Sequence, residues 1–335
     1  MWPYVLLTYF SSNLIVGITL RLGKNIRDDE PIRFRRGEKM STIKSEENIS
    51  ANESNSMTII LFIASTLMIL ILFLSLYRIG VVQAIQDISK GLIHSTLLLN
   101  ALLLAGAVYG VLISYGKMKV EDLGLTVEKL PLAFAFGIVL WISIQIIEGI
   151  VGYAISGTIA IESSWRTEGT ARIGLLIGML FGTALFEEIG FRGFLLVQFI
   201  TKLGRIVKNK VLLISLALLT SQTFFTLMHV PWKMMDQGWT TAVFLDLLFS
   251  VFMNGIIFGL VYLRTQNLFF VMIIHALGNA PTALIEPSIE PPIIMLLLVI
   301  ICCVVWPNLS ACESVWLFER KEESLLTEEY TVHVG

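Results

Sequence analysis

The chain of 335 residues is 55% hydrophobic and only 15% charged, with a mean hydropathy of +0.78. Soluble globular domains usually carry about 25% charged residues, so this composition indicates a membrane protein rather than one with an oversized core. The net charge of −2 gives no indication of nucleic-acid binding. The three cysteines show no CxxC spacing, so we predict neither a disulfide framework nor a zinc site of the cysteine type.

Eight apolar stretches are long enough, or nearly so, to cross a bilayer as helices at about 1.5 Å per residue. We expect an all-α, polytopic membrane bundle of about eight transmembrane helices, because a helix in lipid satisfies its own backbone hydrogen bonds. The predicted spans are residues 57–77, 94–115, 131–159, 172–199, 211–229, 241–263, 268–285 and 292–306. The last two are short, and prolines lie at their ends.

The chain is expected to have three parts: an N-terminal extension (1–56), the transmembrane bundle (57–306) and a cytoplasmic tail (307–335). The extension starts with an apolar stretch that could form a ninth span and continues with a polar stretch that is typical of disorder. A translation start at Met40 or Met57 explains this pattern as well as a ninth span does. We therefore expect residues 1–39 to be dispensable.

Three ionisable side chains lie near the middle of the fourth predicted span, at Glu187, Glu188 and Arg192. Each such residue costs about 2.5–3.5 kcal/mol on insertion scales, so each one is a candidate for a functional role. Glu188 and Arg192 are four residues apart on one helix face and can form a structural ion pair. Glu187 is rotated by about 100° from Glu188, so this pairing leaves it without a partner on its own helix.

Two of the four histidines also lie in apolar spans: His229 ends the fifth, and His275 is in the seventh. A single histidine in a helix is more often structural than catalytic. His275 and Asn279 share a helix face, however, and two donors on one face can hold an oxyanion. Three further polar residues in the spans, Glu148, Asp246 and Asn254, are better explained by helix contacts or by positions near the membrane surface.

At these positions the chain resembles the type II CAAX prenyl endopeptidases and their bacterial relatives, the CPBP family of intramembrane proteases. Its motifs E-E-x-x-x-R at 187–192, F-x-x-x-H at 225–229 and H-x-x-x-N at 275–279 are similar to the three motifs of that family, in the same order and each on its own span. The segment 122–125, Asp-Leu-Gly-Leu, is similar to a short element often found before the third span. The resemblance covers residues 120–285, which gives the expected catalytic core.

The resemblance implies a glutamate-type, metal-independent endopeptidase without a cofactor. Glu187 would activate a water that His229 helps to position, and His275 and Asn279 would donate to the oxyanion. Glu188 and Arg192 would support them, and Phe225 would shape the pocket. The substrate would be a membrane-associated peptide or a lipidated protein, prenylated in the eukaryotic branch of the family, that is cut near its C-terminus in or at the bilayer.

The sequence leaves four functions open. A catalytic endopeptidase fits the full motif set best. A non-catalytic membrane-peptide binder, or a role in bacteriocin self-immunity, would not require Glu187 beside two histidines. A proton-coupled transporter lacks support from an inverted repeat. A zinc metalloprotease could use two histidines and a glutamate, but the chain has no HExxH helix.

Straight, parallel helices would place the candidate residues at different depths. Measured from the lysine-rich side at 1.5 Å per residue, His275 would lie about 10 Å deep, Glu187 about 18 Å and His229 about 27 Å. A single site therefore requires tilted helices or span limits other than those predicted, and the long fourth span is suited to tilt.

Lys and Arg are concentrated in the segments before residue 57, at 116–130, 200–210 and 264–267, and in the tail. With eight spans these segments share one side of the membrane, and the positive-inside rule places that side, with both termini, in the cytoplasm. A reporter fused to the C-terminus should accordingly be active only on the cytoplasmic side. Activity only on the outer side would reverse this orientation.

Overall fold

The computed structural model describes residues 53–280, 282–288 and 291–306. The described residues are helical apart from turns, loops and one isolated β-bridge between Ile161 and Ile285. The predicted all-α fold is therefore confirmed. The proposed extension (apart from residues 53–56) and the tail lie outside the described residues.

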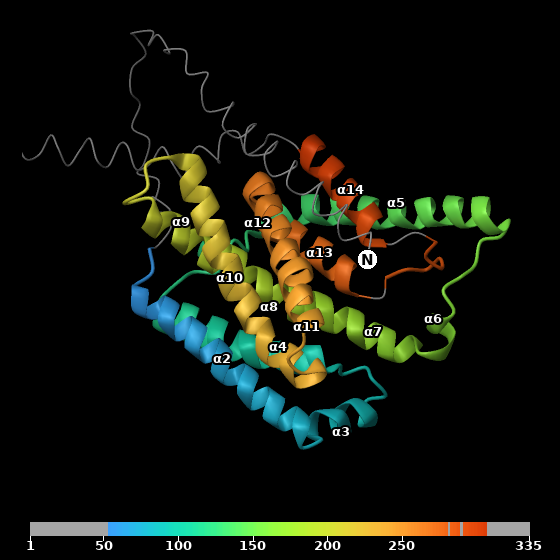
Figure 1. The fold of residues 1–335 in the computed structure, drawn as a ribbon, viewed down its shortest axis with the longest axis horizontal. Coiled ribbons are helices and arrows are strands. Elements are labelled where there is room, and N and C mark those ends of the chain that lie inside the picture. Colours follow the sequence, from blue (N-terminus) through green and yellow to red (C-terminus); the bar gives the residue numbers. More distant parts are fainter. Residues whose placement is uncertain (1–52, 281, 289–290, 307–335) are drawn as a thin grey trace, which may run out of the picture.

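The helices follow one another with short connections (Figure 1). Several are continuous with π-helical stretches, which are named η1, η4, η5 and η6. The elements are α2 (Ser56–Arg78), α3 (Val81–Ile88), α4 (Ser95–Leu103), η1 (Leu104–Tyr115), the 3₁₀ turns η2 (Glu121–Leu123) and η3 (Val127–Lys129), α5 (Leu130–Ser156), α6 (Ser164–Thr167), α7 (Gly169–Gly178), η4 (Met179–Ala184), α8 (Leu185–Glu187), η5 (Glu188–Leu196), α9 (Val197–Leu203), α10 (Lys210–Gln237), α11 (Thr241–Asp246), η6 (Leu247–Phe252), α12 (Met253–Thr265), α13 (Leu268–Asn279) and α14 (Pro291–Val305).

Six helical segments among the described residues are long and apolar enough to cross a membrane. They are Ser56–Arg78, Ser95–Tyr115, Val127–Ser156, Gly169–Leu203, Lys210–Gln237 and Thr241–Thr265. Two shorter apolar helices, Leu268–Asn279 and Ile293–Val305, match the last two predicted spans. Together they fit the prediction of about eight transmembrane helices.

Two predicted ends were wrong, and both concern a proline. The fifth span does not end at His229, because α10 continues through Pro231 to Gln237. Lys233 in this extra turn forms an ion pair with Asp246 on α11, a tertiary contact that helps to hold the helix beyond the proline. The seventh span ends at Asn279 instead of 285. Ala280 precedes a proline and is extended (φ −97°, ψ 152°), because a proline disfavours the helical conformation of the residue before it.

The core of the bundle surrounds η5, whose nine residues are all buried. Phe62 of α2 packs edge-on against Phe191 and Phe194 of η5, at centroid separations of 6.5 and 5.3 Å. Helices α10 and α12 run across the direction of α5 and α7 in Figure 1, so the helices are not parallel. This crossing brings residues together that parallel helices would hold at different depths.

Two glycines of η5 allow neighbouring segments to approach closely. A Cβ atom on Gly190 would lie 2.7 Å from the Phe62 ring. A Cβ atom on Gly193 would lie 2.2 Å from the carbonyl oxygen of Leu123 in the Asp-Leu-Gly-Leu segment. Leu123 is fully buried, and Gly124 after it adopts a left-handed conformation (φ +84°). The segment before α5 therefore packs on the helix that carries the glutamates.

Gly193→Ala should lower the thermal stability of the protein in detergent, because the added methyl meets backbone that cannot move away easily. Overpacking of this kind costs about 1–3 kcal/mol. Gly169→Ala at the start of α7 is the matched control, since its Cβ would meet no atom within 4 Å. Equal melting temperatures for the two variants would show that the contact with Leu123 does not constrain η5.

Candidate active site

Two adjacent glutamates stand at the junction of α8 and η5, where Glu187 ends one element and Glu188 begins the next. Their side chains point to different surroundings, as expected for neighbours on a helix. Glu188 is fully buried, whereas the Glu187 side chain is 14% exposed. The first acid of the motif is therefore partly exposed, and the second faces the protein interior.

Arg192 is fully buried and neutralises Glu188. Its Nη1 donates to Glu188 Oε1 at 3.1 Å, and its Nη2 donates to the carbonyl oxygen of Gly255 at 3.1 Å and to Gln222 Oε1 at 3.4 Å. The guanidinium also lies over the Phe225 ring, 4.6 Å from its centroid. This is the predicted i,i+4 pair, and contacts from α10 and α12 complete it.

Gly255 is needed for this arrangement, because a Cβ atom there would lie 2.2 Å from Gln222 Oε1. Its missing side chain lets the amide of Gln222 and the guanidinium of Arg192 reach the α12 backbone. A buried cation is tolerated in an apolar span only when it is paired and hydrogen-bonded, and Gly255 provides one of these bonds.

His275 of α13 connects the buried pair to Glu187. Its Nδ1 lies 2.6 Å from Glu188 Oε1, and its Nε2 lies 3.7 Å from Glu187 Oε2. Because an ionised carboxylate can only accept, Nδ1 carries the proton of this short bond. The ring is 3% exposed and stacks on Phe258 with a centroid separation of 4.9 Å. Glu188 thus fixes both the tautomer and the direction in which Nε2 points.

His229 of α10 approaches Glu187 from the other side. Its Nε2 lies 3.7 Å from Glu187 Oε1, and its Nδ1 donates to the carbonyl oxygen of Phe225 at 2.8 Å. The side chain is 28% exposed, more than any other member of the group. Both histidines therefore bond through Nδ1 to their supports and present Nε2 to the same carboxylate.

The structure brings Glu187, Glu188, Arg192, His229 and His275 together, with Phe225 beneath them. The helix crossing removes the differences in depth that parallel helices would impose. Asn279 stands apart: it is the last residue of α13 and is exposed, and none of the hydrogen bonds found in the described ranges joins it to the glutamates or histidines. It lies one helical turn beyond His275, at the edge of the group.

The three polar residues assigned to helix contacts differ in their surroundings. Glu148 is buried in α5 and accepts a hydrogen bond from the backbone N–H of Ser288 at 2.7 Å. Asp246 forms an ion pair with Lys233 at 2.6 Å. Asn254 is exposed on α12. Asp246 therefore makes a helix contact, as expected, between α11 and α10, whereas Glu148 binds the segment after α13.

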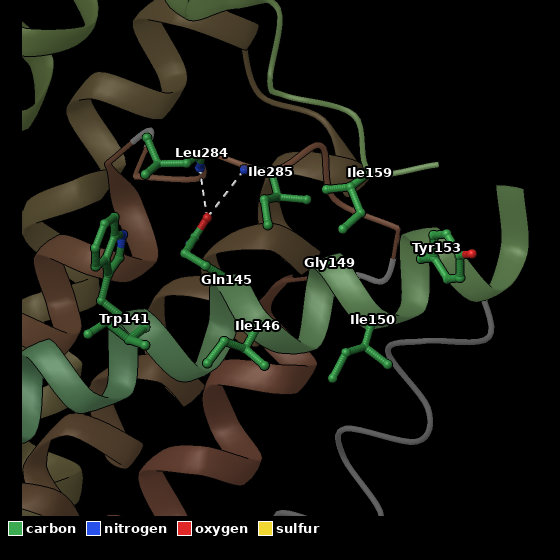
Figure 2. A pocket seen from close by; sticks show the side chains of 10 residues that line it. Trp141, Gln145, Ile146, Gly149, Ile150, Tyr153, Ile159, Leu284 and Ile285 are labelled. Carbon is green, nitrogen blue, oxygen red and sulfur yellow. Dashed lines mark hydrogen bonds between the residues drawn. The ribbon is translucent and has the colours of Figure 1, made fainter. Parts of the chain in front are cut away.

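An apolar pocket of about 510 Å³ lies elsewhere, between α5 and the segment after α13. Figure 2 shows Gln145 at its wall, where the amide oxygen accepts hydrogen bonds from the backbone N–H groups of Leu284 and Ile285 at 2.8 and 3.3 Å. Trp141, also in this wall, donates to the carbonyl oxygen of Thr282 at 2.9 Å. Neither glutamate nor histidine of the candidate site lines the pocket, so these α5 side chains serve to hold the segment that follows Asn279.

Sequence reasoning missed Gln222 as a member of the site. It is fully buried, seven residues before His229 on α10, and its amide supports Arg192. The signal was present in the sequence: an amide two helical turns from a candidate histidine, in an apolar span, lies on the same helix face. Among the described residues no group of three or more His, Cys, Asp or Glu side chains is arranged to hold a metal ion.

The fold and this cluster define a multi-pass integral membrane protein with a glutamate between two histidines. Residues 169–281, from α7 to just beyond α13, match the family model described as type II CAAX prenyl endopeptidase Rce1-like. The resemblance predicted from the three motifs is thereby confirmed over this part of the chain. No curated protein and no solved structure matches the chain.

Arg192→Met should greatly reduce the yield of folded protein, because it leaves the Glu188 carboxylate buried without its cation. Loss of one partner of a buried ion pair typically costs about 3–5 kcal/mol. The double variant Glu188→Gln, Arg192→Met removes both charges and should recover part of the folded fraction. The measurement is the monodisperse fraction on gel filtration in detergent, and a single variant that folds like the wild type would contradict the pairing.

Proposed function

We propose that the protein is an intramembrane endopeptidase that hydrolyses a peptide bond with a water activated by Glu187. The observation that carries this proposal is the position of Glu187 between two histidine Nε2 atoms, at 3.7 Å from each. These separations are too long for direct hydrogen bonds. They leave the carboxylate oxygens able to accept from a water on the open side, next to His229.

His229 is suited to orient that water. Since its Nδ1 donates to Phe225, Nε2 of the neutral ring has a free lone pair and accepts a hydrogen bond from the water, without taking its proton. Glu187 then takes a proton as the water oxygen attacks the scissile carbonyl carbon, and the carbonyl oxygen becomes an oxyanion. Glu187 finally passes that proton to the departing amine, so the products are a new carboxylate and a new N-terminus.

His275 is proposed to stabilise the oxyanion, and the geometry sets a condition for this role. Its Nδ1 proton is already donated to Glu188, so Nε2 can donate only when the ring is an imidazolium. With that charge the formal charges of Glu187, Glu188, Arg192 and His275 sum to zero. Asn279 is the proposed second donor, from the edge of the group. Donors that are held in place in a site of low dielectric stabilise developing charge strongly.

The proposed substrate is a membrane-associated peptide, in keeping with the matched family, and its lipidation is a further part of the proposal. The more exposed members of the group, His229 and Asn279, lie near the C-terminal ends of α10 and α13. With eight alternating spans, these ends face away from the lysine-rich loops. The orientation of the termini therefore also decides from which compartment a substrate reaches the site.

Glu187→Ala, His229→Ala and His275→Ala should each abolish cleavage of a membrane peptide while the protein remains folded. Asn279→Ala should slow cleavage less completely, by about two to three orders of magnitude, as for the loss of one oxyanion donor. The assay measures the rate at which each purified variant cleaves a farnesylated CAAX reporter in detergent. Each rate is normalised to the amount of folded protein found by gel filtration.

Asn254→Ala is the matched control for these variants, because Asn254 is an exposed polar residue within a span. The same assay with a chelator separates the two hydrolytic mechanisms, since activity that depends strictly on zinc would replace glutamate catalysis by a metalloprotease mechanism. A Glu187→Ala variant with full activity would refute the mechanism. A wild type that cleaves no membrane peptide would refute the proposed function.

A further inference from the structure

A second ion pair lies at the open side of the candidate site. Lys233 follows His229 by four residues on α10, so the two side chains share a helix face. Lys233 Nζ lies 2.6 Å from Asp246 Oδ2, and the two side chains are 25% and 34% exposed. Asp246 is also within electrostatic range of His229. A cation is therefore held one helical turn from His229 on α10.

We propose that Lys233 binds a carboxylate of the substrate peptide and so determines where the peptide is cut. The inference rests on the proposed function and adds a specificity-determining residue to it. An ammonium group has three N–H donors, and Asp246 Oδ2 can occupy one of them. The remaining donors can form charge-assisted hydrogen bonds to a second carboxylate, which are about twice as strong as neutral ones.

The distance along α10 sets which carboxylate can reach Lys233. Four residues of helix span about 6 Å, and the lysine side chain extends the reach by several ångströms. An extended peptide covers about 3.3–3.6 Å per residue, so the carboxylate would lie about two to four residues from the scissile bond. It would be the free C-terminus of a short peptide tail or an acidic side chain at that position.

Asp246 has two opposite effects on Lys233. Its carboxylate orients the Lys233 ammonium group, but it also competes with the substrate carboxylate for that group. Removal of Lys233 should therefore weaken the preference for a carboxylate, whereas removal of the Asp246 charge should strengthen it. If the pair only joined α10 to α11, both changes would break the same contact and would act in the same direction.

The experiment compares kcat/KM for three lipidated peptides of one sequence in detergent, with the cleavage point identified by mass spectrometry. One ends in a free carboxylate three residues after the scissile bond, one ends there in an amide, and one is amidated with Glu at that position. The proteins are the wild type, Lys233→Met, Asp246→Asn and the control Lys208→Met, an exposed lysine in the loop before α10. Lys233→Gln replaces the methionine variant if that variant does not fold.

We expect the wild type to prefer the carboxylate over the amide by about tenfold or more, the size expected for a hydrogen bond to a charged group. Lys233→Met should reduce this ratio towards one, Asp246→Asn should raise it, and Lys208→Met should leave it unchanged. Preference for the amidated Glu peptide would assign the site to an acidic side chain, and preference for the free terminus would assign it to the C-terminus.

Two further outcomes separate the two proposals. If the wild type cleaves the peptides and the carboxylate-to-amide ratio of kcat/KM is the same in every variant, the role of Lys233 is overturned and the proposed function stands. A wild type that cleaves none of the peptides would overturn both. Parallel loss of stability in Lys233→Met and Asp246→Asn without any change in ratio would show that the pair is structural.

Discussion

The buried pair of Glu188 and Arg192 is the interaction on which the rest of the site depends. Two charges inside an apolar helix are costly, and they are stabilised here because the guanidinium has acceptors on two other helices and the carboxylate has a second donor. These bonds tie η5 to α10, α12 and α13. The buried pair thus fixes the relative positions of α10 and α13, the helices that carry His229 and His275.

From this constraint the geometry around Glu187 follows. Glu188 holds His275 by Nδ1, and the Phe225 carbonyl holds His229 in the same way, so each ring directs Nε2 at the first glutamate. Glu188 therefore has a structural role in the buried ion pair, and Glu187 remains partly exposed. This division of roles between two neighbouring carboxylates allows one of them to lie between two histidines within a membrane bundle.

Much of this was predictable from the sequence, because the cost of burying charge in lipid marks the residues concerned. The four-residue spacing of Glu188 and Arg192 predicted their pair, and the motif order predicted that Glu187, His229 and His275 would meet. Helix tilt was not predictable, since spacing along a chain does not fix crossing angles. The end of α10 was missed because a contact of Lys233 outweighed the local effect of Pro231. Gln222 was missed because an amide carries no formal charge.

The central claim, that Glu187 activates a water, is tested most directly by one turnover in H₂¹⁸O with enzyme in excess over substrate. Attack by an activated water predicts ¹⁸O in the new carboxylate of every product molecule and none in Glu187, as read by mass spectrometry of the product and of the enzyme peptide. An unlabelled product together with ¹⁸O in Glu187 would show that the carboxylate itself attacks the peptide, and would contradict the account.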